Sequence, residues 1–230
     1  MIHLFALLSL LLCGVCYTGF QNSSHFHNTS NRRSLLLLVF GGALLLRLLL
    51  AYTTHGFSND IACFAAWADR IFTLGPGQFY SAEMFTDYPP GFMYVLYLIG
   101  ALRSLLQIPY YSDLHILLLK LPAILCDIAC GFLLYREAVK RLHFSDLQGI
   151  FAASAYLFQP AVILNSSCWG QVDSVYTLMI ILMCLFLMKG NLLPAYAVYG
   201  LGVLLKPQML IFTPVLLAGI WDHVCLLYTS

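Results

Sequence analysis

A few charged and polar side chains stand beside long apolar runs, where a charge needs water or a partner. Asp60 falls in SNDIACFAAWADR, Asp87 in TDYPPG and Lys206 in LLKPQ. On insertion scales, each charge within hydrocarbon costs about 2.5–3.5 kcal/mol. Side chains retained at that cost are candidates for acid–base chemistry or for holding a charged substrate.

Asp60 has two interpretations. As an acid in the first turn of a helix, it would interact favourably with the helix dipole. As a carboxylate at the boundary between water and membrane, it could act as a general base and take the proton from an attacking hydroxyl. The sequence leaves both interpretations open.

Asp87 and Tyr88 precede a stiff Pro-Pro pair. Asp87 could close a turn on its own backbone, or the segment could form a rigid wall that positions a substrate. Lys120 and Asp127 lie seven residues apart, which places them on one helix face two turns apart. They are too distant for direct contact, so both should face other helices or a polar cavity.

The segment WGQVDS combines an aromatic face at Trp169, an amide at Gln171 and a carboxylate at Asp173. This combination is typical of a sugar-contacting set, although Asp173 or Ser174 could also serve as a helix N-cap. Lys206 precedes a helix-breaking proline and could bind a phosphate. It could equally be a lysine that extends its ammonium group to the membrane edge.

The composition indicates a membrane protein. The 230 residues are 61% hydrophobic and 9% charged, with a mean hydropathy of +0.84. A soluble domain has no need for so much apolar content, because its surface must be wet. The net charge of +1 gives no case for nucleic acid as a partner. Eight apolar runs are candidate spans: Ile2–Phe20, Ser34–Thr54, Gly91–Ile108, Leu114–Tyr135, Gly149–Leu164, Ser174–Met188, Leu192–Leu205 and Met209–Trp221.

The eight cysteines sit mostly inside apolar runs. Cys13 and Cys16 match C-x-x-C but have no nearby His or acid, and Cys126 and Cys130 lie one helical turn apart. We interpret both pairs as helix packing. No His, Cys and Asp set has metal-ligand spacing, so no metal site is predicted, and dependence on a divalent metal stays open.

Basic residues predict the orientation in the membrane. Arg32 and Arg33 form one basic group, and Arg136, Lys140 and Arg141 form a second; the positive-inside rule places both on the cytoplasmic side. Residues 55–90 then form a long first outer loop. Within it we expect an amphipathic helix along the membrane surface, ended by Gly75-Pro76-Gly77. Its apolar face comprises Ile61, Phe64, Ala65, Ala68 and Phe72.

The number of crossings raises a parity question. The acidic outer loop and the later segment NSSCWGQVDS can share a side only if an even number of spans separates them, and three candidates do. Either Gly91–Ile108 does not fully cross the membrane, or the basic group at 136–141 faces outside. The sequence does not decide between these arrangements.

Five motifs in order resemble those of GT-C glycosyltransferases, which are multi-spanning enzymes that use lipid-phosphate sugars. They are SNDIACFAAWADR, DYPPG, LKLPAILCDIA, FQPAVILNSSCWGQVDS and LLKPQ, and the likeness runs from about Arg47 to Trp221. The resemblance is greatest to bacterial mannosyltransferases related to the GPI second-mannose transferase. The glucosyltransferases of N-glycan assembly share the D-Y-P-P stretch and a Lys-Gln pair near Lys206 and Gln208.

The resemblance implies a fold and a reaction. The fold is an all-α, polytopic transmembrane helical bundle. The reaction is an inverting transfer of a sugar, expected to be mannose, from a polyprenyl-phosphate donor to a glycan or glycolipid hydroxyl on the non-cytoplasmic face. The protein would be integral and multi-pass, in the cell membrane of a bacterium or the endoplasmic reticulum membrane of a eukaryote. Membrane lipids would surround it, and no cofactor is implied beyond the donor lipid.

The resemblance also implies residue roles. Asp60 would take the acceptor's proton, and Asp87 and Tyr88 would wall the site. Lys206, with Lys120, would steady the phosphate as its charge develops. Trp169, Gln171 and Asp173 would contact the sugar or acceptor, and Gln208 would belong to the Lys-Gln pair.

The expected organisation has three parts. Residues 1–33 form an apolar segment and polar link, and residues 34–221 form the catalytic module. Residues 225–230 resemble a translated sequencing adaptor, so we expect a non-native tail and a module that is incomplete at its C-terminus. Such a piece can be inactive by itself.

Two other functions compete with the transferase. A transporter or proton-coupled carrier could use Lys120, Asp127, Asp173 and Lys206 as a charge pathway, although the inverted repeats typical of such carriers are not seen. A catalytically silent scaffold that binds lipid-linked sugars is the other alternative. Turnover would separate it from an enzyme.

Overall fold

The computed structural model describes residues 11, 14, 17–18, 32–81 and 85–219. Within these residues the chain is helical and contains no strand, which confirms the all-α prediction. The predicted tail at 225–230 and most of the predicted span Ile2–Phe20 lie outside the described residues.

Most helices follow the predicted apolar runs closely, and local sequence signals mark several of their ends. The run Gly149–Leu164 is an exception, because one helix ends at Leu157 and the next begins at Pro160. Ser145 and Gln148 form a capping box that starts α6, and Pro90 occupies the first turn of α4. The elements are α2 (Arg32–Thr53), α3 (Ser58–Leu74), η1 (Pro76–Gln78), α4 (Pro90–Leu105), α5 (Asp113–Lys140), α6 (Asp146–Leu157), α7 (Pro160–Ile163), the π-helix η2 (Leu164–Trp169), α8 (Asp173–Met188), α9 (Leu192–Leu205) and η3 (Pro207–Phe212).

Two helices, α2 and α5, are long and apolar enough to cross a membrane. A third span is possible by length and composition if α6 and the segment Pro160–Trp169, which meet at a 51° bend, count as one. The helices α4, α8, α9 and Pro207–Gly219 are apolar but shorter. With 16 residues, α4 extends about 24 Å, less than the hydrocarbon thickness of about 30 Å.

The chain divides into two compact units. The first comprises Met1–Ile61 and Lys120–Ser174, and the second comprises Ala62–Leu119 and Val175–Ser230. Helices α3, α5 and α8 each contribute residues to both units.

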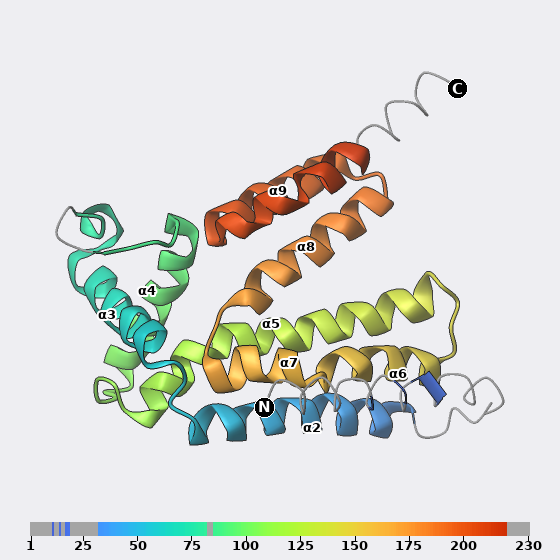
Figure 1. The fold of residues 1–230 in the computed structure, drawn as a ribbon, viewed down its shortest axis with the longest axis horizontal. Helices are drawn as coiled ribbons and strands as arrows, with labels where there is room; N and C mark the ends of the chain where they lie inside the picture. Colours follow the sequence, from blue (N-terminus) through green and yellow to red (C-terminus); the bar gives the residue numbers. More distant parts are fainter. Residues whose placement is uncertain (1–10, 12–13, 15–16, 19–31, 82–84, 220–230) are drawn as a thin grey trace. The chain divides into compact units, whose positions relative to one another are not determined.

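In the first unit, α2 runs alongside α6 and η2 (Figure 1). Gly131 of α5 allows close packing, since a Cβ there would lie 2.6 Å from the Leu157 side chain. The core of this unit joins three helices, α2, α5 and α6. Its buried members are Ala43, Tyr135, Ile150, Ala153 and Leu157.

In the second unit, two close helix contacts depend on glycine. A Cβ at Gly100 of α4 would lie 2.5 Å from the carbonyl oxygen of Ala68 in α3, and one at Gly91 would lie 2.6 Å from that of Leu204 in α9. A separate hydrophobic cluster joins α8, α9 and the helical segment Pro207–Gly219. It contains Met183, Ala195, Met209 and Leu216.

The predicted amphipathic helix is present as α3, and its apolar stripe is wider than expected. Trp67 and Ile71 are buried together with the predicted residues Ile61, Phe64, Ala65 and Ala68. The helix ends where predicted: Gly75 has a φ of 81° and donates its N–H to the Ile71 carbonyl at 3.0 Å. The structure confirms the helix; its position on a membrane surface remains a prediction.

Candidate functional site

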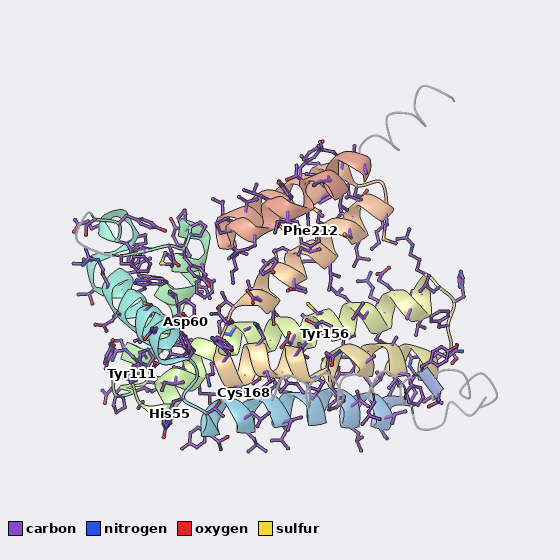
Figure 2. All side chains as sticks on the ribbon, in the orientation of Figure 1. His55, Asp60, Tyr111, Tyr156, Cys168 and Phe212 are labelled. Atoms are coloured by element: carbon purple, nitrogen blue, oxygen red, sulfur yellow. The ribbon has the colours of Figure 1, made fainter. Side chains whose placement is uncertain are left out.

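Asp60 lies in the first turn of α3, where Figure 2 labels it. Its Oδ2 accepts hydrogen bonds from Trp169 Nε1, at 3.2 Å, and from Gln171 Nε2. These partners are 109 and 111 positions away along the chain. Oδ1 accepts no hydrogen bond from the residues that the structure describes. One carboxylate oxygen of Asp60 is therefore held by two side-chain donors from a distant part of the chain.

Backbone bonds hold this arrangement, which we call the carboxylate site (Asp60, Trp169 and Gln171). Phe57 donates its N–H to the Trp169 carbonyl at 2.9 Å, so the start of α3 is joined directly to the end of η2. The N–H groups of Gly170 and Gln171 both reach the Asn165 carbonyl, at 3.1 and 2.9 Å. Gly170 has a φ of 86°, a left-handed turn that favours glycine.

Asp173 enters the same unit through Asn165, whose Nδ2 donates to the Asp173 carboxylate at 2.9 Å. Asn165 also belongs to η2, a type of helix turn that occurs often at functional sites. The structure thus gathers three of the predicted sugar-contacting residues, Trp169, Gln171 and Asp173, around one turn. Asn165 was not singled out from the sequence as part of this group.

Phe57 is a second residue that sequence reasoning missed. Its ring lies 5.5 Å from the Trp169 ring, and the two side chains are 46% and 51% exposed. An exposed aromatic pair beside a carboxylate offers an apolar surface for the C–H face of a sugar. The one signal for Phe57 in the sequence is its place directly before the start of α3, where a large aromatic side chain is exposed.

Lys120 is completely buried, and its ammonium group contacts protein oxygens. Nζ donates to the carbonyl oxygens of Ala51, Thr54 and Ser167 at 3.2, 2.6 and 2.9 Å, and lies 3.2 Å from Thr54 Oγ1. A lysine ammonium has three N–H donors. These contacts differ from the phosphate contact that the resemblance implies.

Asp127 forms a buried ion pair with Arg47, whose side chain, like that of Asp127, has 0% exposure. Arg47 Nε lies 3.3 Å from Asp127 Oδ2, and the guanidinium also donates to the carbonyls of Ala43 and Leu157. Tyr156, labelled in Figure 2, donates its hydroxyl to Asp127 Oδ1 at 3.0 Å. Asp127 therefore meets other helices, as predicted, and the sequence analysis did not identify Arg47 as its partner.

In the second unit, the DYPPG and LLKPQ segments come together. Lys206 is 9% exposed, and its Nζ lies 5.7 Å from the centroids of both the Tyr88 and Tyr176 rings. This is the distance range of a cation–π contact. Tyr88 also packs edge-to-face on Phe64, and its ring is 5.4 Å from that of Phe92.

Several hydrogen bonds hold the segment before α4. Trp67 Nε1 donates to the Phe85 carbonyl at 3.0 Å, and Arg70 Nε donates to the Phe79 carbonyl at 3.1 Å. Tyr80 donates its hydroxyl to the Tyr88 carbonyl at 3.0 Å. Burial raises the pKa of Tyr80, which helps to keep that donor protonated.

The remaining predicted site residues, Asp87 and Gln208, are exposed in the second unit. The predicted residues thus form two groups, one in each unit: the first contains Asp60, Lys120, Trp169, Gln171 and Asp173, and the second contains Asp87, Tyr88, Lys206 and Gln208. Among the described residues, no group of three or more His, Cys, Asp or Glu side chains could hold a metal ion.

Comparison with known proteins adds no relative: no family model, curated protein or solved structure matches this chain.

Proposed function

We propose that this chain is a membrane-embedded inverting glycosyltransferase that moves a sugar, mannose being the first candidate, from a polyprenyl-phosphate donor to an acceptor hydroxyl. The observation that carries the proposal is the carboxylate site. At the N-terminus of α3, the carboxylate of Asp60 accepts hydrogen bonds from the indole of Trp169 and the amide of Gln171, which are both remote from it in sequence. Protein sites that bind sugars commonly combine apolar ring surfaces with a few polar groups.

The proposed reaction follows from the two oxygens of Asp60. Trp169 and Gln171 hold Oδ2, and Oδ1 takes the proton of the acceptor hydroxyl. The acceptor oxygen then forms a bond to the anomeric carbon of the sugar. The bond from that carbon to the phosphate oxygen breaks, and the lipid phosphate leaves with the electron pair. Attack opposite the leaving group inverts the anomeric centre.

The remaining parts of the proposal follow from the sequence resemblance. They are a polytopic GT-C-like bundle, α3 lying on the non-cytoplasmic membrane surface, a glycan or glycolipid acceptor, and phosphate contact by Lys206. Asp87, Tyr88 and Gln208 keep their predicted roles near the substrate. The two helices with the length and apolarity of membrane spans agree with an integral membrane location.

The test is a transfer assay on the protein reconstituted in phosphatidylcholine vesicles. Radiolabelled polyprenyl-phosphate mannose is supplied with a panel of glycolipid acceptors. We expect label in the acceptor, in a linkage whose anomeric configuration is opposite to that of the donor. Retention of the donor configuration would overturn the inverting mechanism.

The same vesicles separate the competing functions. A carrier would accumulate labelled free sugar or ions inside the vesicle without forming a glycosidic product. A silent scaffold would bind the donor lipid without consuming it. Either result, obtained across the donor and acceptor panel, would contradict the transferase.

A further inference from the structure

The geometry points to Lys120 as a positioning residue: we infer that its buried ammonium group fixes the turn that presents Trp169 and Gln171 to Asp60, and that it does not bind the donor phosphate. The importance of this role for catalysis rests on the proposed function. The structural part of the inference does not, because it concerns contacts made without substrate.

A buried charge at position 120 is costly. Lys120 lies within α5, one of the two helices able to span a membrane, and has 0% exposure. A lysine in hydrocarbon costs about 2.5–3.5 kcal/mol on insertion scales, so it needs strong compensation. The protein supplies this compensation with its own oxygens, which accept hydrogen bonds from the ammonium group.

The oxygens that bind the ammonium group come from the end of α2 and from η2. Ala51 and Thr54 lie at the C-terminal end of α2, where backbone carbonyls have no partner within the helix. Ser167 lies in η2, two residues before Trp169. The ammonium group therefore joins the end of α2 to the turn that leads into the carboxylate site.

The lysine stem fits closely against that turn. A Cβ added at Gly170 would lie 3.3 Å from Cε of Lys120 and 2.6 Å from Cδ1 of Ile61. Gly170 stands between Trp169 and Gln171, the two donors to Asp60. The lysine stem thus packs beneath the segment whose side chains hold the carboxylate.

All three N–H donors of the ammonium group have acceptors within the protein. The three N–H bonds of the ammonium are matched by three carbonyl oxygens, and Thr54 Oγ1 lies within reach as a fourth acceptor. A phosphate could take an N–H from Lys120 only if one of these buried carbonyls lost its partner. The arrangement favours an internal structural role.

The experiment replaces Lys120 with Met, which keeps the apolar stem and removes every donor. Accessibility of Trp169 is read by acrylamide quenching of tryptophan fluorescence without substrate, in a Trp221→Phe background. Of the two remaining tryptophans, Trp169 is 51% exposed and Trp67 only 2%, so quenching reports on Trp169. If the turn is released, we expect the quenching constant to rise by about twofold, as for a locally opened segment.

Kinetics provide a second readout. For Lys120→Met we expect kcat to fall by about 10²-fold, the loss that a displacement of about 1 Å in the site can cause, with the KM for polyprenyl-phosphate mannose unchanged. A phosphate-binding lysine would instead raise that KM. Unchanged quenching would overturn the positioning role, and a raised donor KM would overturn the inference that Lys120 does not bind the donor phosphate.

Two further variants keep the test informative. Lys140→Met is the matched control, because Lys140 is exposed on the same helix and its loss should change neither readout. Lys120→Gln retains an amide donor and should give intermediate quenching and partial recovery of kcat. If Lys120→Met does not fold, the Gln variant decides alone: quenching equal to that of the unsubstituted chain would refute the positioning role. Changed quenching in a chain that transfers no sugar would support the positioning role and count against the proposed function.

Discussion

At the scale of single residues, the deepest charges in the first unit are internally paired. Arg47 and Asp127 have no exposed side-chain surface and share bonds with Tyr156 and two backbone carbonyls. Breaking such a pair leaves one charge buried without compensation. The pair therefore contributes to the way in which α2, α5 and α6 fit together.

We predict that Arg47→Met lowers the free energy of unfolding by about 3–5 kcal/mol, because Asp127 remains buried and unpaired. The double variant with Arg47→Met and Asp127→Leu should recover much of the lost free energy of unfolding. The measurement is an unfolding titration with SDS in mixed micelles.

The matched control is Arg32→Met. Arg32 lies 3.2 Å from Asp146, but its side chain is 49% exposed, so its loss should change stability by less than about 1 kcal/mol. Equal losses for the two arginine variants would show that burial does not set the strength of the Arg47–Asp127 pair.

Part of the candidate site could be predicted from residue types. Asp60, Trp169 and Gln171 stood out as an acid, an aromatic ring and an amide near apolar runs, and the structure places them in contact. The partners of Lys120 could not be predicted, because they are backbone carbonyls, which every residue has. Arg47 was missed because one charge in a leucine-rich run does not identify its partner on another helix.

At the scale of elements, the boundaries of the helices were the most predictable feature. The run Ser174–Met188 corresponds to α8, and Leu192–Leu205 to α9, because apolar length and the flanking polar or glycine residues mark both ends. The contact between α4 and α9 was not predicted, because Gly91 after Pro-Pro has the sequence signature of a turn. In the structure it is also a point of close backbone approach.

That contact gives a prediction at the same scale. Gly91→Ala should lower the thermal unfolding midpoint in detergent, by an amount equivalent to about 1–3 kcal/mol, because the new Cβ would lie 2.6 Å from the Leu204 carbonyl oxygen. Backbone atoms of a helix cannot easily move aside.

Gly200→Ala in α9 is the control, since a Cβ there meets nothing within 4 Å. It should stabilise the helix by about 0.5–1 kcal/mol, the usual advantage of alanine over glycine. If both alanine variants changed the midpoint in the same direction and by the same amount, close approach at Gly91 would be refuted.

At the scale of the whole molecule, the distribution of basic residues predicts the orientation in the membrane. The group at Arg136, Lys140 and Arg141 should be cytoplasmic and the segment from His55 to Pro90 external. We predict that a cysteine at Ser81 reacts with an impermeant maleimide in sealed right-side-out vesicles, whereas one at Lys140 reacts only after permeabilisation.

Both positions are exposed in the structure, so the difference in labelling reports on the membrane side and not on burial within the protein. A background without the native cysteines removes other reactive thiols. The reverse labelling pattern would place the carboxylate site on the cytoplasmic side and contradict the proposed location of transfer.

The most direct measurement is the rate of mannose transfer by Asp60→Ala, with and without added formate. The proposal predicts a rate about 10²–10⁴-fold lower, the usual contribution of a general base, and partial recovery when formate supplies a carboxylate. Asp113→Ala, which removes another exposed first-turn aspartate, should leave the rate unchanged. An Asp60→Ala variant that transfers mannose as fast as the unsubstituted chain would contradict the central claim.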